Sequence, residues 1–324
     1  MDKFELIKKA FRSEPTERVP YAIWKHFPEF DKTPEGLLKA QMDFQKKFDS
    51  DIMKISISGR AFASDFGAEL GGYDPVSGSR ICVKYPIEEI DDWEKVKNID
   101  VESGEFGNQI KAMQFLYNEV EGKVPTMMTV FSPLMVASQI DPNIIVHFRK
   151  DPQLIKEHFK IIISSMTDFT KASLDAGANG IFLATQHFNE RLTNEERLEL
   201  AFKPMKSLIK KTIKKNNFLV LHLHGDNPDY KLATKLPINA INWHDQQTSP
   251  SLSEARQIFK RGLLGGLNAE SWKDISDPTE VESMISSVYT NFKGSGLIIA
   301  PGCVIPQFVS DQLIENVVKT IKNL

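Results

Sequence analysis

The chain has 324 residues and a formal net charge of −3, with 41% hydrophobic and 26% charged residues. This composition is typical of a soluble globular protein, and the small negative charge argues against binding to nucleic acid. No apolar segment reaches the roughly 20 residues that a membrane span needs, and the charged start of the chain is unlike a signal peptide. We therefore expect a cytoplasmic protein that binds small molecules or another protein.

Short apolar runs alternate along the chain with longer segments of helical periodicity, which is typical of repeated βα units around a parallel sheet. Helices are expected to begin at Thr33, Asp151, Thr193 and Asp277. No linker divides the chain, so eight strands with their crossovers predict an α/β fold, a single (β/α)8 TIM barrel over residues 1–324. The eight runs are 19–24, 51–56, 125–131, 180–184, 218–224, 240–243, 262–267 and 296–300.

The segment 69–86 lies between the second and third runs and contains several glycines and prolines. Such a segment is typical of a hairpin, and we expect it to be an insert near the mouth of the barrel. Cys82 in this segment has no nearby partner and is expected to pack as a small hydrophobic residue. With only Cys82 and Cys303 in the chain, no disulfide framework is expected.

Polar residues concentrate where the apolar runs end, which is where barrel enzymes place their active sites. His222 and His224 close the run 218–224, and Cys303 follows the last run. Side chains alternate along a strand, so both histidines point to one side and Leu223 to the other. Two imidazoles and one thiolate would make a three-ligand zinc site with an open fourth position.

A plainer interpretation is that the two histidines are hydrogen-bonded core residues and that Cys303 is a small buried hydrophobe. The coincidence of the three residues at strand ends favours a metal site over this alternative. His187 and His244 are expected to be pocket-wall residues, or to orient a ligand from behind, rather than to bind the metal. We expect the substrate pocket to include Trp24, Phe131, Asp226, Trp243 and Glu270, of which Asp226 and Glu270 are also candidates for a fourth ligand.

The chain resembles the uroporphyrinogen decarboxylase superfamily, whose members are single (β/α)8 barrels and include zinc- and corrinoid-dependent methyltransferases. The resemblance extends over nearly the whole chain and keeps the order of the family's motifs. These are Glu17-Arg18-Val19-Pro20, Phe48-Asp49-Ser50-Asp51-Ile52, Phe131-Ser132-Pro133, Ile241-Asn242-Trp243, Gly265-Gly266-Leu267-Asn268 and Ala300-Pro301-Gly302-Cys303.

The methyltransferase branch binds zinc through a His-x-Cys motif and a distant cysteine, and His222 and Cys303 match the outer two of these ligands. His224 stands where the branch has its middle cysteine. Replacing a thiolate by an imidazole makes the site one unit more positive and the zinc a stronger Lewis acid. The resemblance thus implies one Zn²⁺ per chain, a methylcobamide supplied by a corrinoid protein, and a thiol or similar nucleophile as methyl acceptor. Activation of a hydroxyl group or water by the more acidic zinc is left open, and so is a homodimer.

The decarboxylases of the superfamily use no metal and bind the pyrroles of their substrate with an aspartate, which Asp51 matches. The resemblance therefore makes Asp51 a catalytic candidate, together with His26 and His187 near the pocket. Other family features are missing, because Gln139 replaces a tyrosine and only Arg60 and Arg80 are candidates for binding substrate carboxylates. Our first interpretation is a zinc-dependent methyltransferase; uroporphyrinogen decarboxylation and a non-catalytic corrinoid- or metal-binding barrel are the alternatives.

Overall fold

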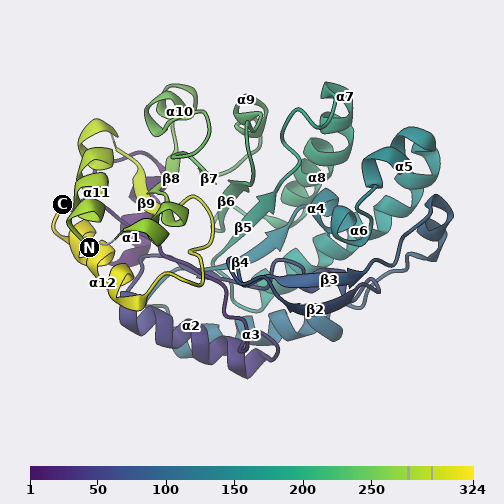
Figure 1. Cartoon of the computed structure of the whole chain (residues 1–324), viewed down its shortest axis with the longest axis horizontal. Helices are drawn as coiled ribbons and strands as arrows, with labels where there is room; N and C mark the ends of the chain where they lie inside the picture. Colours follow the sequence, from purple (N-terminus) through teal and green to yellow (C-terminus); the bar gives the residue numbers. More distant parts are fainter. Residues whose placement is uncertain (276–277, 293–294) are drawn as a thin grey trace.

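The computed structural model describes residues 1–275, 278–292 and 295–324. Within them, seven parallel strands form one curled sheet, in which each strand pairs with the next in chain order (Figure 1). This order is the one that repeated βα units produce. The strands are β1 (Met53–Ile55), β4 (Thr126–Phe131), β5 (Gly180–Thr185), β6 (Phe218–Leu223), β7 (Ala240–Trp243), β8 (Gly262–Leu267) and β9 (Leu297–Pro301).

The first apolar run, 19–24, does not form a regular strand, which corrects the expectation of eight. Its one bridge joins Tyr21 to Ile299 of β9, and on its other side the amide of Asp51 donates to the Tyr21 carbonyl oxygen at 2.9 Å. The run thus lies between β9 and the segment leading into β1. Regular pairing is lost because Pro20 has no N–H and because the amide of Tyr21 donates instead to the Asp51 carboxylate.

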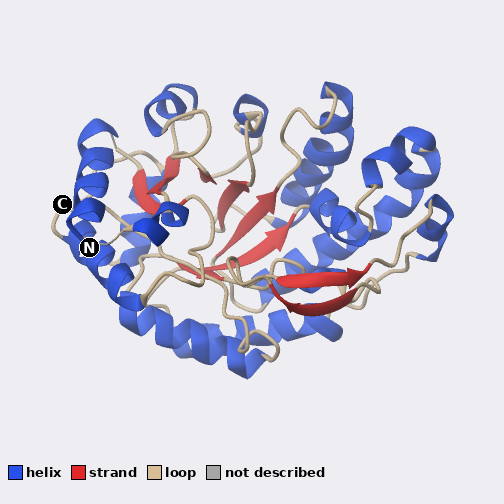
Figure 2. Ribbon diagram, in the orientation of Figure 1, coloured by secondary structure: helices blue, strands red, loops and turns tan. Residues whose placement is uncertain are grey.

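Helices lie around the outside of the curled sheet (Figure 2), and none of those described is long and apolar enough to cross a bilayer. The helix starts expected at Thr33, Asp151 and Thr193 are confirmed, since each side chain accepts a hydrogen bond from a backbone amide of the first turn. The start expected at Asp277 lies outside the described residues. The helices are α1 (Lys3–Phe11), α2 (Pro34–Phe48), α3 (Gly104–Val120), α4 (Pro133–Ile140), α5 (Ile144–Lys150), α6 (Pro152–Asp175), α7 (Asn194–Glu196), α8 (Lys203–Thr212), α9 (Tyr230–Ala233), α10 (Leu252–Ile258), α11 (Pro278–Phe292) and α12 (Asp311–Lys322).

A separate two-stranded antiparallel sheet is formed by β2 (Glu69–Tyr73) and β3 (Arg80–Lys84). The guanidinium of Arg80 lies 3.7 Å from the carboxylate of Asp31 and 3.8 Å from that of Glu105, which joins β3 to the segments around α2 and α3. Arg80 is therefore paired with acidic groups of the protein itself.

The core has two layers because side chains alternate between the two faces of each strand. One layer packs the sheet against the helices, and the other fills the inside of the curled sheet. At the N-terminal end of the strands the inner layer is apolar and is closed by α1, where the rings of Phe11 and Phe218 lie 5.3 Å apart. A Cβ on Gly262 would lie 2.8 Å from the Phe11 ring, so glycine is needed for this close packing. Polar side chains are thereby left to the C-terminal ends of the strands.

Asp51 lies two residues before β1, at the opposite end of the strand from the predicted site, which corrects its assignment as a catalytic residue. Its side chain is fully buried, and its two oxygens accept hydrogen bonds from the guanidinium of Arg18 at 2.6 and 2.7 Å. One of them also accepts the amide of Tyr21 at 3.0 Å. In this structure the carboxylate joins the first apolar run to β1.

Arg18→Met should therefore destabilise the fold, because it leaves the buried Asp51 carboxylate without its charge partner. The Arg18 side chain is 39% exposed, so we expect a loss of about 2 kcal/mol, less than the 3 to 5 kcal/mol of a fully buried pair. Urea unfolding would measure the loss. Lys39→Met, which breaks the exposed Lys39–Asp43 pair, is the control and should leave the free energy of unfolding nearly unchanged. Equal stability of the two variants would contradict this role for Arg18.

Candidate metal centre

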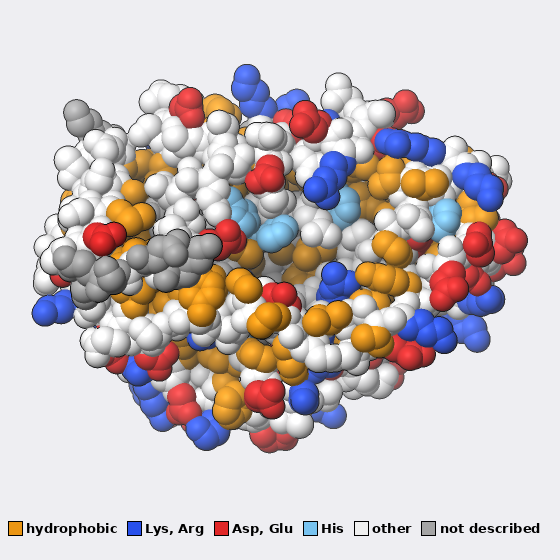
Figure 3. All heavy atoms as spheres, in the orientation of Figure 1, with side chains coloured by type: hydrophobic (Ala, Val, Ile, Leu, Met, Phe, Trp, Pro, Cys, Tyr) orange, Lys and Arg blue, Asp and Glu red, His pale blue; other side chains and the backbone are white. Residues whose placement is uncertain are grey.

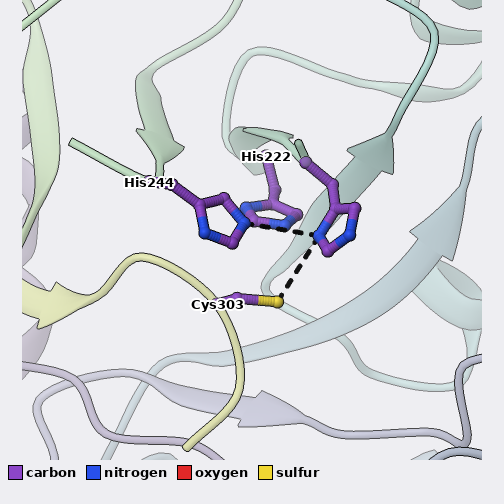
Figure 4. Close-up of side chains that lie close together, drawn as sticks. His222, His244 and Cys303 are labelled. Carbon is purple, nitrogen blue, oxygen red and sulfur yellow. Dashed lines mark hydrogen bonds between the residues drawn. The ribbon is translucent and has the colours of Figure 1, made fainter. Parts of the chain in front are cut away.

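Four side chains that could hold one metal ion lie together at the C-terminal ends of the strands. They are His222 in β6, His224 just after it, His244 just after β7, and Cys303 just after β9 (Figure 4). One potential ligand atom from each lies within 4.8 Å of all the others. His224 Nδ1 is 3.4 Å from His244 Nε2 and 3.6 Å from Cys303 Sγ.

The register of β6 and β7 explains why these histidines meet. The parallel pairing places His222 beside Asn242 and Leu223 beside Trp243. Because side chains alternate along a strand, His222 and Asn242 both point to the inside of the sheet. Two residues further along each chain segment, His224 and His244 point to the same side. We expected His244 to be a pocket-wall residue, but it lies within reach of the metal position. Alternation of side chains along β7 predicts this inward direction of His244.

Trp243 points the other way, which corrects its assignment to the substrate pocket. Its side chain is fully buried in the layer between sheet and helices. The indole N–H donates to the Pro250 carbonyl oxygen at 2.8 Å, and the ring lies 5.0 Å from that of Tyr230. Since Asn242 faces inward, its neighbour in the strand has to face outward.

Cys303 reaches the histidines through a close approach of two backbone segments. The amide of Gly302 donates to the carbonyl oxygen of Leu267, the last residue of β8. A Cβ on Gly302 would lie 3.0 Å from the Cα of His244. Glycine at this position therefore lets the segment after β9 pass close to the segment after β7, which brings the sulfur of Cys303 toward the imidazoles.

An asparagine fixes the orientation of His222. The amide nitrogen of Asn242 donates to the carbonyl oxygens of Leu264 and Pro301 at 3.0 and 3.1 Å, so its oxygen must face His222 Nδ1, 2.6 Å away. That oxygen can only accept, so Nδ1 carries the proton. His222 is then the tautomer with its free lone pair on Nε2. A histidine needs such a free lone pair to bind a metal ion.

Gln247 does the same for His244. Its amide oxygen lies 2.8 Å from His244 Nδ1, and its amide nitrogen donates to the Glu270 carboxylate at 2.8 Å. Nδ1 therefore carries the proton, and Nε2 faces the cluster. Glu270 is exposed and acts here through Gln247, so its assignments to the pocket wall and to a fourth ligand are corrected.

The titration of the four groups is governed by their mutual contacts. Burial alone would raise the pKa of the Cys303 thiol, but hydrogen bonds with the three imidazoles hold that pKa well below its ordinary value. Burial alone would lower the pKa of His244, but its contacts with Cys303 and Gln247 raise that pKa to about 9. The pKa of His222 is lowered by burial. The cluster therefore favours a thiolate at neutral pH.

This donor set suits zinc. Imidazole nitrogen and thiolate sulfur are the preferred zinc ligands, at about 2.0 to 2.1 Å and 2.3 Å, and a tetrahedral site places its ligand atoms roughly 3.3 to 3.8 Å apart. The contacts of 3.4 and 3.6 Å around His224 Nδ1 lie in that range. The carboxamide partners of His222 and His244 supply the hydrogen bonds that metal-bound histidines usually make.

A cavity of about 630 Å³ opens beside this cluster. Figure 3 shows histidine side chains at the hollowed centre of one face of the molecule. Trp24, His26, Phe131 and His187, all predicted site residues, line the cavity together with His222, His224 and Cys303. Ser77 and Ser79, between β2 and β3, line it too.

The two further histidines of the cavity are neutral; His26 is buried and His187 is partly buried. Burial lowers the pKa of His26 and of His187 to about 4. The Nδ1 atom of each is buried without a hydrogen-bond partner in the described protein, and so is the side-chain oxygen of Gln139 in the same wall. Unpaired polar atoms lining a cavity indicate that a polar ligand or water binds there.

One acidic residue predicted for the pocket lies outside the cavity, and two basic residues that were not predicted lie in its wall. Asp226 is exposed in the loop after β6 and is not in the cavity wall, so its place in the substrate pocket is also corrected. Lys54 and Arg191 line the cavity beside Arg60, and the sequence analysis named only Arg60 of these three. Lys54 lies inside the apolar strand β1, where the sequence gives no local signal of the direction in which a lysine points.

Comparison with known proteins gives one family and several similar folds. The family model described as uroporphyrinogen decarboxylase (URO-D) matches residues 2–324. The methylcobamide:CoM methyltransferase MtbA from Methanosarcina mazei is 19% identical to the chain, over 98% of this chain and 97% of that protein. The structure of a methyltransferase from Methanosarcina mazei is similar with a TM-score of 0.83 at 14% identity, covering 100% of this chain and 99% of that one.

A more distant fold likeness is to a B12-independent methionine synthase from Shewanella sp. W3-18-1. Its TM-score is 0.60 at 11% identity, over 95% of this chain and 92% of that one. At these identities the structural comparisons establish the fold of the chain and leave its chemistry to be argued from the site.

Gln247→Leu should weaken zinc binding by about 10- to 100-fold. The variant removes the oxygen that accepts the proton of His244 Nδ1 and thereby fixes the orientation of the imidazole ring. Competition with a chromophoric zinc chelator would measure the affinity. Gln247→Glu keeps an acceptor oxygen and should retain most of the affinity. Gln312→Leu, on the exposed face of α12, is the matched control and should leave it unchanged. Unchanged zinc affinity in Gln247→Leu would exclude His244 from the metal centre.

Proposed function

Since the chain belongs to the uroporphyrinogen decarboxylase family, we propose that it is a zinc-dependent methyltransferase that moves a methyl group from a methylcorrinoid on a partner protein to a thiol. The observation that carries the proposal is the cluster of three imidazoles and one thiol beside a cavity at the strand ends. The relative from Methanosarcina mazei, whose name pairs a methylcobamide with CoM, supports the same class of reaction.

His222, His224, His244 and Cys303 would hold the zinc ion. An acceptor thiol would have to take the place of one of these four ligands on the zinc, and the ion would then lower the pKa of that thiol, so that its sulfur is an anion at neutral pH. Asn242 and Gln247 accept the Nδ1 protons of His222 and His244, so that Nε2 is the atom each ring would offer to the metal. Compared with two thiolates and one imidazole, this donor set carries less negative charge and so favours an anionic acceptor.

The chain's own part in the reaction is to position the acceptor and to exclude water. Trp24, Phe131 and Phe182 form an apolar wall of the cavity, while the neutral His26 and His187 offer polar atoms without adding charge. The corrinoid would supply the methyl group without its bonding electron pair, which would remain with the cobalt, and the thiolate would supply the electron pair of the new sulfur–carbon bond. The methyl group thus passes from the corrinoid to the thiolate with no other reactant.

The corrinoid protein would dock over the open end of the cavity. The turn between β2 and β3 belongs to this rim, because Ser77 and Ser79 line the cavity and the Val76 carbonyl oxygen accepts the Gln307 amide at 2.8 Å. We propose that residues 69–86 contribute to the docking surface. A methyl group on the corrinoid would then enter the cavity toward the cluster.

The arrangement of charges disfavours uroporphyrinogen decarboxylation. Asp51, which matches the family's substrate-binding aspartate, lies outside the cavity and is occupied by Arg18. Arg80 is paired with Asp31 and Glu105. Two of the groups that would bind and orient a porphyrinogen are therefore committed elsewhere.

The proposal is tested by mixing the zinc-loaded protein with methylcobalamin and a panel of small thiols, and following the loss of the methylcobalamin spectrum. We expect methyl transfer that depends on zinc and falls by at least about 100-fold in Cys303→Ala, which removes one metal donor. Mass spectrometry of the methylated thiol confirms the product.

Two parallel assays separate the alternatives. Metal-independent formation of coproporphyrinogen from uroporphyrinogen would replace the proposal by decarboxylation. Zinc and corrinoid binding without methyl transfer to any thiol of the panel would instead favour a non-catalytic barrel.

A further inference from the structure

A buried carboxyl group directly follows one of the four residues of the cluster. Asp245 is next to His244 in the chain and is 6% exposed. Burial raises the pKa of its carboxyl group to about 6, although hydrogen bonds with Gln246 and Gly266 act in the opposite direction. Burying such a group costs free energy that its contacts have to offset. The proposed reaction makes no use of Asp245, so these contacts point to another role.

The side chain of Asp245 reaches the end of strand β8. Both of its oxygens accept the amide of Gly266, at 3.1 and 3.0 Å. A Cβ on Gly265 would lie 2.4 Å from the Asp245 Oδ1 atom, and Gly266 has a φ of +100°, a conformation that favours glycine. One glycine therefore leaves the space that the carboxylate occupies, and the other donates to it.

Asp245 and His244 leave the chain in different directions. His244 faces the cluster, whereas Asp245 contacts β8 and is not among the groups that reach the metal position. Asp245 is therefore not a metal ligand in this arrangement. It acts on the stretch of backbone that it shares with His244.

The backbone at His244 lies beyond the regular pairing of β7 with β8. That pairing ends at Asn242 and Leu264, two residues before His244. The neighbouring ligand is supported differently, because the amide of His224 donates to the carbonyl oxygen of Thr185, the last residue of β5, at 2.8 Å. The position of His244 therefore depends on contacts other than the strand ladder.

Two sets of contacts define the turn that begins at His244. Its carbonyl oxygen accepts the amides of Gln247 and Thr248, each at 2.9 Å, which closes the turn. The hydrogen bonds between Asp245 and Gly266 then fasten this turn to the end of β8. Without them, the turn would be joined to β8 only through the chain on either side.

We propose that Asp245 is a positioning residue of the metal centre. By accepting the amide of Gly266, it holds the backbone where the imidazole of His244 reaches the metal position. Its role differs from that of Gln247, which orients the ring of the same histidine. The inference rests on the metal-binding part of the proposed function and does not depend on methyl transfer.

A double-variant cycle on zinc affinity tests the proposal, with no thiol or corrinoid present and a chromophoric chelator as competitor. Asp245→Ala should weaken zinc binding by about 10- to 100-fold, as the loss of a residue that supports a ligand does. In His244→Ala, which has already lost that ligand, the same change should cost less than about twofold. An equal loss in both proteins, or no loss in either, would overturn the assignment.

Two further variants separate positioning from a general effect on the fold. Asp245→Asn keeps an oxygen that can accept the Gly266 amide and should retain most of the zinc affinity. Asp65→Ala is the matched control, because Asp65 lies outside the cavity wall and also accepts two backbone amides, at 3.0 and 2.9 Å, at the start of α3. It should lower the thermal unfolding temperature of the metal-free protein and leave the zinc affinity unchanged. A comparable loss of affinity in Asp65→Ala would reduce Asp245 to a purely structural residue.

Gly265→Ala tests the same contact from the other side and keeps Asp245 itself, which covers the case that Asp245→Ala does not fold. The added methyl group would displace the carboxylate, so zinc binding should weaken as it does in Asp245→Ala. Added to Asp245→Ala, where no carboxylate stands in the way, it should cost little more. Full zinc affinity in Gly265→Ala would contradict the assignment.

X-ray absorption at the zinc edge gives a readout that a purely structural role would not change. Imidazole rings scatter beyond the nearest neighbours of the metal and can therefore be counted. We expect three imidazoles in the wild-type protein and two in Asp245→Ala, with the sulfur neighbour kept in both. Three imidazoles in Asp245→Ala would overturn the proposal, whereas absence of methyl transfer by a wild-type protein with this centre intact would count against the proposed reaction alone.

Discussion

The parallel register of β6 and β7 is the constraint on which the site depends. It sets His222 beside Asn242. Two residues further on, it sets His224 near His244. Both pairs face inward because every second side chain of a strand does so, and the apolar partners Leu223 and Trp243 face the helices for the same reason. A shift of one residue between these strands would separate the imidazoles and place Trp243 in the cavity.

The chemistry of the site follows from which charges are buried and which are absent. His222 and His244 are oriented by carboxamides rather than carboxylates, so their support adds no negative charge. Cys303 is the one thiol of the cluster, and no acid lines the cavity in the described part of the chain. With a divalent ion bound, this end of the cavity would carry a net positive charge. His224, which stands where the methyltransferase branch has a cysteine, acts in the same direction, because an imidazole adds no negative charge to the site.

Strand-end positions and alternation were enough to predict seven of the strands and the meeting of His222, His224 and Cys303. The errors have physical causes. Alternation along β7 turns Trp243 outward and His244 inward, opposite to the predicted roles of both. The first run has the composition of a strand, but Pro20 and the Asp51 side chain prevent regular pairing. Asp51 was assigned by its match to a family motif, but its role is decided by Arg18, a contact between segments 33 residues apart. Gln247 could not be found from sequence, because its importance lies in its contacts with His244 and Glu270 in the folded chain.

The central claim is that one metal ion is bound by three imidazoles and one thiolate. X-ray absorption at the zinc edge of the zinc-loaded protein tests it most directly, because nitrogen and sulfur neighbours differ in distance and scattering. We predict about three nitrogen neighbours near 2.0 Å and one sulfur neighbour near 2.3 Å, the usual zinc distances. The sulfur shell should disappear in Cys303→Ala and persist in Cys82→Ala, whose thiol contacts the carbonyl oxygen of Lys84 in β3. A spectrum without a sulfur shell, or with one that survives Cys303→Ala, would contradict the account.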